Sequence, residues 1–129
     1  MVVIDTSVWI DFFRNPAADG NGRLEELIRE NNRAAVCGLI LQEILQGIKD
    51  QKLFALTRQR LLFLPYLEAP RDVHLLAADL YRHLRAKGVT VPSTDTIIAA
   101  VAIHHGFPLF TRDAHFSEIA RHSELRLYS

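Results

Sequence analysis

Short runs of apolar, often β-branched residues alternate in this sequence with longer amphipathic segments, and few folds accommodate that alternation. Parallel strands that are buried on both faces have this short, continuously apolar character, and a crossover, usually a helix, connects each strand to the next. We therefore expect an α/β three-layer sandwich, with a mainly parallel central sheet of four to five short strands flanked by helices. The predicted strands are residues 2–4, 34–37, 64–67, 109–111 and a final alternating strand, 125–128.

Helical spacing marks the segments between those strands. The clearest helix begins near Pro70 and Asp72, carries one apolar face, and stops at Gly88. Segment 93–105 is apolar nearly all round, which predicts a buried helix that ends at Gly106. The other predicted helices are 6–13, 23–31, 39–48, 51–63 and 114–121.

Length and charge limit the class of protein. With 129 residues, 49% of them hydrophobic, the chain has the size and apolar content of one domain, which we place at residues 1–129. The formal net charge is zero, which argues against a nucleic-acid binder that relies on a large basic surface. Gathering four of the 15 acids in one site would nevertheless leave a surface with an excess of four positive charges, which attracts phosphates.

Cellular location can be argued from cysteine usage and hydropathy. Cys37 is the single cysteine, so no intrachain disulfide can form, and its apolar neighbours indicate a small buried residue. An acid stands at position 5, where a signal peptide needs a basic and then a long apolar region. The longest apolar run, 97–103, is far shorter than the ~20 residues of a membrane span. We expect a cytoplasmic protein that does not associate with membranes.

Four acids stand at the ends of predicted elements. Asp5 follows the first strand, and Asp113 lies just past the strand 109–111. Asp95 falls in the first turn of the buried helix, and Glu43 lies in the helix after the second strand. Because ligands of open α/β sheets gather at the carboxyl ends of the strands, all four acids are candidates for one site.

Each acid also has a purely structural interpretation. Asp5 and Asp113 are suited to cap the helices that follow them, and Asp95 is suited to complement a helix dipole. Glu43 lies in a mostly apolar predicted helix, and Gly47 one turn later leaves room for a ligand to approach its carboxylate. The structural interpretation of this pair is an exposed Glu beside a glycine that is there by chance.

Considered together, four neighbouring carboxylates would repel one another and take up protons unless a cation neutralised them. Hard oxygen ligands, without cysteine or suitably spaced histidines, favour Mg²⁺ or Mn²⁺. His104 and His105 are adjacent and point in different directions on a helix, so they cannot form the paired face of a zinc site. His115 lies close enough to Asp113 to touch a substrate, although a surface histidine is the commoner case.

The order and spacing of these residues resemble PIN-domain proteins, and particularly the small VapC toxins of toxin-antitoxin modules. The resemblance covers essentially the whole chain. It rests on Asp5-Thr-Ser after the first strand, Glu43 with Gly47, Asp95 followed by Ile98-Ala99-Ala100 and Gly106, and Thr111-Arg-Asp113 followed by Phe116.

The resemblance implies a metal-dependent endoribonuclease in which a carboxylate-held Mg²⁺ or Mn²⁺ activates a water molecule that hydrolyses an RNA phosphodiester. By similarity, Asp5, Glu43 and Asp95 would be ligands directly or through water. Asp113 would bind a second ion or tune the site. Ser7 and Thr111 would hydrogen-bond to the carboxylates and orient them, and local cap or turn roles suit these hydroxyls equally well.

The resemblance also implies a protein partner, a small VapB-like antitoxin whose tail lies in an apolar groove and brings a basic residue to the acids. The cluster Trp9, Ile10, Phe12 and Phe13 is a candidate lining for that groove or for a homodimer contact, with core packing as the default. The alternative function is a non-catalytic α/β protein-interaction domain whose acids are helix caps.

Overall fold

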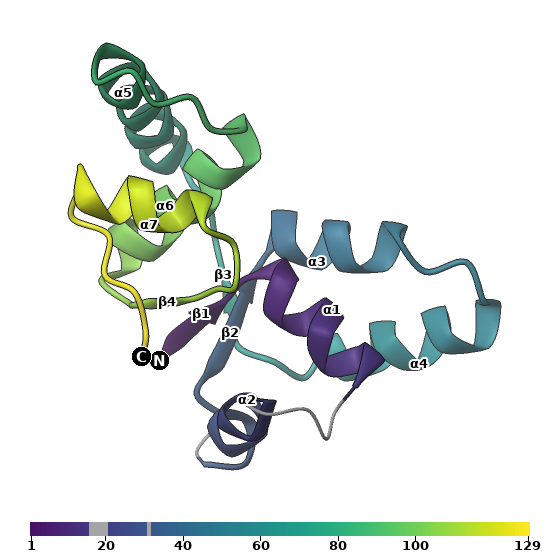
Figure 1. The fold of residues 1–129 in the computed structure, drawn as a ribbon. Coiled ribbons are helices and arrows are strands. Elements are labelled where there is room, and N and C mark those ends of the chain that lie inside the picture. The colour runs from purple at the N-terminus through teal and green to yellow at the C-terminus, as the bar shows by residue number, and fades with distance from the viewer. Residues whose placement is uncertain (16–20, 31) are drawn as a thin grey trace.

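A four-stranded parallel sheet forms the centre of the computed structural model, which describes residues 1–15, 21–30 and 32–129 (Figure 1). Its strands lie in the order β3-β2-β1-β4, with Val3 of β1 opposite Ala35 of β2 on one side and Leu109 of β4 on the other. The strands are β1 (Val2–Ile4), β2 (Ala34–Cys37), β3 (Tyr66–Leu67) and β4 (Leu109–Phe110).

Helices cover both faces of this sheet, which confirms the predicted three-layer α/β arrangement. Figure 1 shows α1, α3 and α4 on one side of the strands and α5, α6 and α7 on the other. The helices are α1 (Thr6–Arg14), α2 (Asn21–Arg29), α3 (Gly38–Gln46), α4 (Gln51–Leu61), α5 (Arg71–Ala86), α6 (Ser93–His105) and α7 (His115–Arg121).

The apolar patterning explains these layers. Every residue of β1 and β2 is buried, as expected for parallel strands with helices on both faces. Helix α6 is buried from Ile98 to Ala102, and Gly106 ends it with a positive φ of 73° that suits glycine. Helix α5 packs against α6 through its single apolar face.

The strand order creates a crevice at a defined place. The chain moves from β1 to β2 to β3 in one direction, and the crossover through α5 and α6 then returns it to the other side of β1. The order of strands therefore reverses between β1 and β4, and the crevice outside their carboxyl ends is where such folds bind ligands.

Several predicted boundaries differ in the structure. Leu64 donates its backbone N–H to Leu61 O in the last turn after α4, so β3 is only Tyr66–Leu67. Residues 125–128 form an isolated bridge, Leu109 to Leu127, in place of the predicted strand, because the two-residue β4 offers few backbone groups to pair with. The predicted end of the second helix at Asn31 lies outside the described residues.

No helix among the described residues has the length and apolar character needed to cross a bilayer.

Candidate metal centre at the carboxyl edge of the sheet

Asp5 immediately follows β1 and is 4% exposed. It occupies the N-cap position of α1, but its carboxylate makes no capping hydrogen bond to the helix. Instead, Asp5 Oδ2 accepts hydrogen bonds from Ser7 Oγ at 2.7 Å and from Thr111 Oγ1 at 2.8 Å. The carboxylate is thus oriented by two hydroxyl groups from different segments, and the helix-cap interpretation does not describe its contacts.

The loop after β4 is held against Asp5 by the same hydroxyls. Asp113 N donates to Thr111 Oγ1 at 3.0 Å, and Arg112 N donates to Ser7 Oγ at 3.1 Å. The two hydroxyl oxygens lie 3.5 Å apart, and either can be the donor. The contacts of Ser7 with Thr111 and Arg112 join residues more than 100 positions apart and hold the loop that carries Asp113.

Asp95, Asp113 and His115 form a group of candidate metal ligands. One ligand atom from each lies within 4.8 Å of the other two. His115 Nδ1 lies 3.1 Å from Asp95 Oδ2 and 3.4 Å from Asp113 Oδ1. His115 N also donates to Asp113 Oδ1 at 2.9 Å, so this carboxylate is engaged at the start of α7 as a local turn would require.

Electrostatics at Asp95 follow from its position in the first turn of α6, where it is 8% exposed. Burial raises the pKa of the Asp95 carboxyl, and the negative charges of Asp113 and Asp5 raise it further. The hydrogen bond and charge of His115 oppose that rise. A cation at this place would relieve both the burial cost and the repulsion among the carboxylates.

Glu43 connects to this edge through a different hydroxyl. It is half-buried on α3, and Thr6 Oγ1 donates to Glu43 Oε1 at 2.8 Å. Because Thr6 follows Asp5 directly, Glu43 is tied to the start of α1 but stands outside the group of Asp95, Asp113 and His115. The predicted position of Gly47 inside a helix is wrong, because α3 ends at Gln46 and Gly47 is its C-cap.

A family model described as PIN domain matches residues 2–122 of this chain. The chain belongs to the PIN-domain family. Ribonuclease VapC11 of Mycobacterium tuberculosis is 36% identical to it over 132 aligned residues, which cover 100% of this chain and 98% of VapC11. The family resemblance expected from the four motifs is therefore confirmed.

Solved structures of related complexes have the same fold. The DNA-bound VapBC complex of Salmonella typhimurium matches with a TM-score of 0.82 at 20% identity, covering 98% of this chain and 96% of that chain. VapBC2 of Rickettsia felis, bound to a DNA fragment from its promoter, matches with a TM-score of 0.78 at 22% identity, covering 99% and 98%.

The donor set of this PIN domain suits a hard divalent cation. Carboxylate oxygens from Asp5, Asp95 and Asp113 surround one edge of the sheet, with Glu43 nearby on α3. Two neighbours of these acids have roles that the sequence-based prediction does not include. His115, expected mainly as a surface residue, contacts Asp95, and Thr6 of the Asp5-Thr-Ser motif donates to Glu43. The spacing of His115 from Asp113 is the sequence signal for the first of these contacts.

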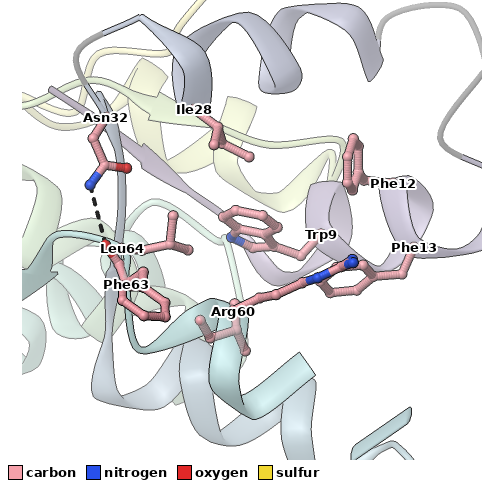
Figure 2. A pocket seen from close by; sticks show the side chains of 9 residues that line it. Trp9, Phe12, Phe13, Ile28, Asn32, Arg60, Phe63 and Leu64 are labelled. Carbon is pink, nitrogen blue, oxygen red and sulfur yellow. Dashed lines mark hydrogen bonds between the residues drawn. The ribbon is translucent and has the colours of Figure 1, made fainter. Parts of the chain in front are cut away.

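An apolar pocket of about 520 Å³ lies on the α1 side of this PIN domain (Figure 2). Residues of α1, α2 and the C-terminal end of α4 line it, and Asn32 Nδ2 hydrogen-bonds Phe63 O at its margin. Phe63 is 77% exposed, whereas Trp9 is 2% exposed and its Nε1 has no hydrogen-bond partner among the described residues. The lining is Trp9, Phe12, Phe13, Ile28, Asn32, Arg60, Leu61, Phe63 and Leu64.

A second groove, of about 670 Å³, shares Phe12, Phe13 and Arg60 with this apolar pocket. It extends along α1, α3 and α4 to Glu43 and Gly47. The two hollows therefore adjoin one another and lead from an aromatic surface to one of the candidate metal ligands.

Proposed function

We propose that this PIN domain is a metal-dependent endoribonuclease and the toxin component of a type II toxin-antitoxin system, acting in the cytoplasm. The observation that carries the proposal is the approach of Asp5, Asp95 and Asp113 at the switch point of the sheet, where their mutual repulsion calls for a cation. The full-length likeness to a protein named as a ribonuclease supports the substrate class.

We assign Asp5, Glu43, Asp95 and Asp113 as the residues that hold Mg²⁺ or Mn²⁺ directly or through water. Ser7 and Thr111 orient the Asp5 carboxylate through the two hydrogen bonds to its Oδ2. A bound divalent ion would supply an activated water and neutralise charge on the phosphoryl oxygens. The burial of Asp5 and Asp95 keeps their carboxylates fixed and partly shielded from bulk water.

We also propose a VapB-like antitoxin as the protein partner. The solved neighbours include VapBC complexes, and the apolar pocket at Trp9 and Phe63 suits an apolar segment of such a protein. The adjoining groove leads to Glu43, so the segment would bring a basic side chain to the acids. We further propose that the protein forms a homodimer, which would bury exposed apolar side chains such as Leu75, 59% exposed on α5.

The decisive experiment incubates the purified protein with single-stranded and structured RNAs, with Mg²⁺ or with chelator. Asp5→Asn should lower the cleavage rate by roughly 100-fold or more, because loss of a ligand exceeds the 10- to 100-fold cost typical of outer partners. Its melting temperature should be unchanged or raised, because one of several crowded negative charges is removed.

Asp79→Asn is the matched control, since it makes the same change at an exposed position on α5. Its cleavage rate should equal that of the wild type. Metal-independent cutting that survives Asp5→Asn would contradict the proposal. Absence of cutting by the wild type, together with tight antitoxin binding, would favour the non-catalytic interaction domain.

A further inference from the structure

A further hollow, the α5–α6 groove, lies on the opposite side of the sheet from the apolar pocket. It has a volume of about 310 Å³. Ala77 and Thr96 are buried and lie at its base, whereas Arg82, His74 and Ser93 are exposed and lie at its margins.

Arg82 gives the α5–α6 groove a positive charge. The chain as a whole has equal numbers of acids and bases, but no acid lines the groove, which contains one arginine and one histidine. Among the residues that the structure describes, Arg82 forms no hydrogen bond or ion pair. Its guanidinium is therefore available for an anion.

An aromatic ring stands beside that arginine. Tyr81 is half-buried, and Arg85 Nη1 donates to its hydroxyl at 3.4 Å while the Arg85 guanidinium lies 6.0 Å from the ring centroid. The ring position is thus restrained by a neighbour one turn along α5. A restrained aromatic ring beside a free guanidinium is the combination that single-stranded nucleic acids contact through base stacking and phosphate pairing.

The α5–α6 groove and the candidate metal centre share helix α6. Ser93 begins α6, and Asp95 is in the first turn of the same helix. Ser93, Thr96 and Ile97 form the α6 side of the groove, and Asp95 lies in the same first turns of that helix on another face.

We propose that the α5–α6 groove binds the sugar-phosphate backbone of single-stranded RNA next to the cleaved bond, with Arg82 pairing a phosphate. This inference rests on the proposed ribonuclease function and names the surface that holds its substrate. Arg82 is one of the basic residues that lie outside the acidic site, and the proposal gives it the role of binding substrate.

The test measures binding of a short fluorescein-labelled single-stranded RNA of mixed sequence in Mg²⁺. All proteins carry Asp5→Asn, so that the RNA stays intact. Arg82→Gln should weaken binding about fivefold, as expected for one lost charged hydrogen bond of ~1 kcal/mol. Between about 50 and 200 mM salt, the slope of log K against log salt should fall by ~0.7, the value for one phosphate contact on a single strand.

Two further variants make the test specific. Arg82→Lys keeps the charge and should retain most of the salt slope. Arg29→Gln removes the same charge from α2, where Arg29 pairs with Glu25, and should change neither affinity nor slope. In the cleaving protein with Asp5 intact, Arg82→Gln should raise KM several-fold with a much smaller change in kcat.

An unchanged salt slope and affinity in Arg82→Gln would overturn the inference, as would equal losses in Arg82→Gln and Arg29→Gln. Loss of antitoxin binding in Arg82→Gln with RNA binding intact would assign the groove to a protein instead. These outcomes are separate from failure of the ribonuclease proposal, which would appear as absence of cleavage by the protein with Asp5 intact.

Discussion

A single oxygen atom, Thr111 Oγ1, contacts two candidate metal ligands that are far apart in the sequence. It donates to Asp5 Oδ2 and accepts from Asp113 N, so one hydroxyl positions two candidate ligands. Replacing this hydroxyl with a methyl group should loosen both carboxylates without removing any negative charge.

Thr111→Val should therefore lower the affinity for Mn²⁺ or Mg²⁺ by 10- to 100-fold, the range typical of groups that orient metal ligands. Isothermal titration calorimetry with Mn²⁺ measures this change. Thr90→Val, at an exposed position, is the control and should bind metal as the wild type does. Equal affinity in Thr111→Val and the wild type would show that Asp5 and Asp113 need no such orientation.

The raised pKa of Asp95 predicts how stability depends on pH when metal is absent. Burial is the main cause, so the folded protein binds this proton more tightly than the unfolded chain does. Stability from this group is therefore fully present below the unfolded pKa of about 3.9 and is lost as pH rises through the raised folded pKa. Above the raised folded pKa, the charged Asp95 carboxylate is destabilising.

Asp95→Asn should accordingly melt at a higher temperature than the wild type near pH 7 in chelator, with a difference that shrinks toward pH 4. Thermal unfolding followed by circular dichroism across that range measures the effect. A lower melting temperature near pH 7 would mean that the hydrogen bond to His115 outweighs burial.

At the scale of elements, the apolar pocket between α1, α2 and α4 exposes a side chain that contributes little to the core. Phe63 is 77% exposed at the pocket, so truncating it should leave the fold intact while removing a large apolar contact for a partner.

Phe63→Ala should weaken binding of the VapB-like antitoxin about tenfold or more, as measured by calorimetry. Leu75→Ala removes a 59% exposed side chain from α5, on the other side of the sheet, and should bind the antitoxin normally. Weaker binding in Leu75→Ala alone would place the antitoxin on α5. RNA cleavage by either variant without antitoxin should match the wild type.

The elements that periodicity predicted well are those with one strong signal. Strands β1 and β2 are continuously apolar, and α5 and α6 have defined stops at Gly88 and Gly106, so their predicted positions agree with the structure. The tail at 125–128 alternates like a strand, but its pairing depends on the length of β4, which alternation does not encode.

At the scale of the whole molecule, topology brought Asp5 and Asp113 together in prediction and in structure. The rule that parallel strands expose their carboxyl ends at one edge is sufficient for acids that lie within a few residues of a strand end. The same rule does not predict which side chains hydrogen-bond to one another. The pairing of Glu43 with Thr6, and the place of His115 between Asp95 and Asp113, depend on rotamers and helix rotation that no sequence period specifies.

The contact between β1 and β4 also has a consequence for folding. The Thr111 hydroxyl that orients Asp5 lies 106 positions later in the chain, so the Asp5 carboxylate gains this partner only when β4 has paired with β1. A folding intermediate that has formed β1 and β2 but not β4 therefore holds Asp5 without the hydroxyl that joins it to Asp113.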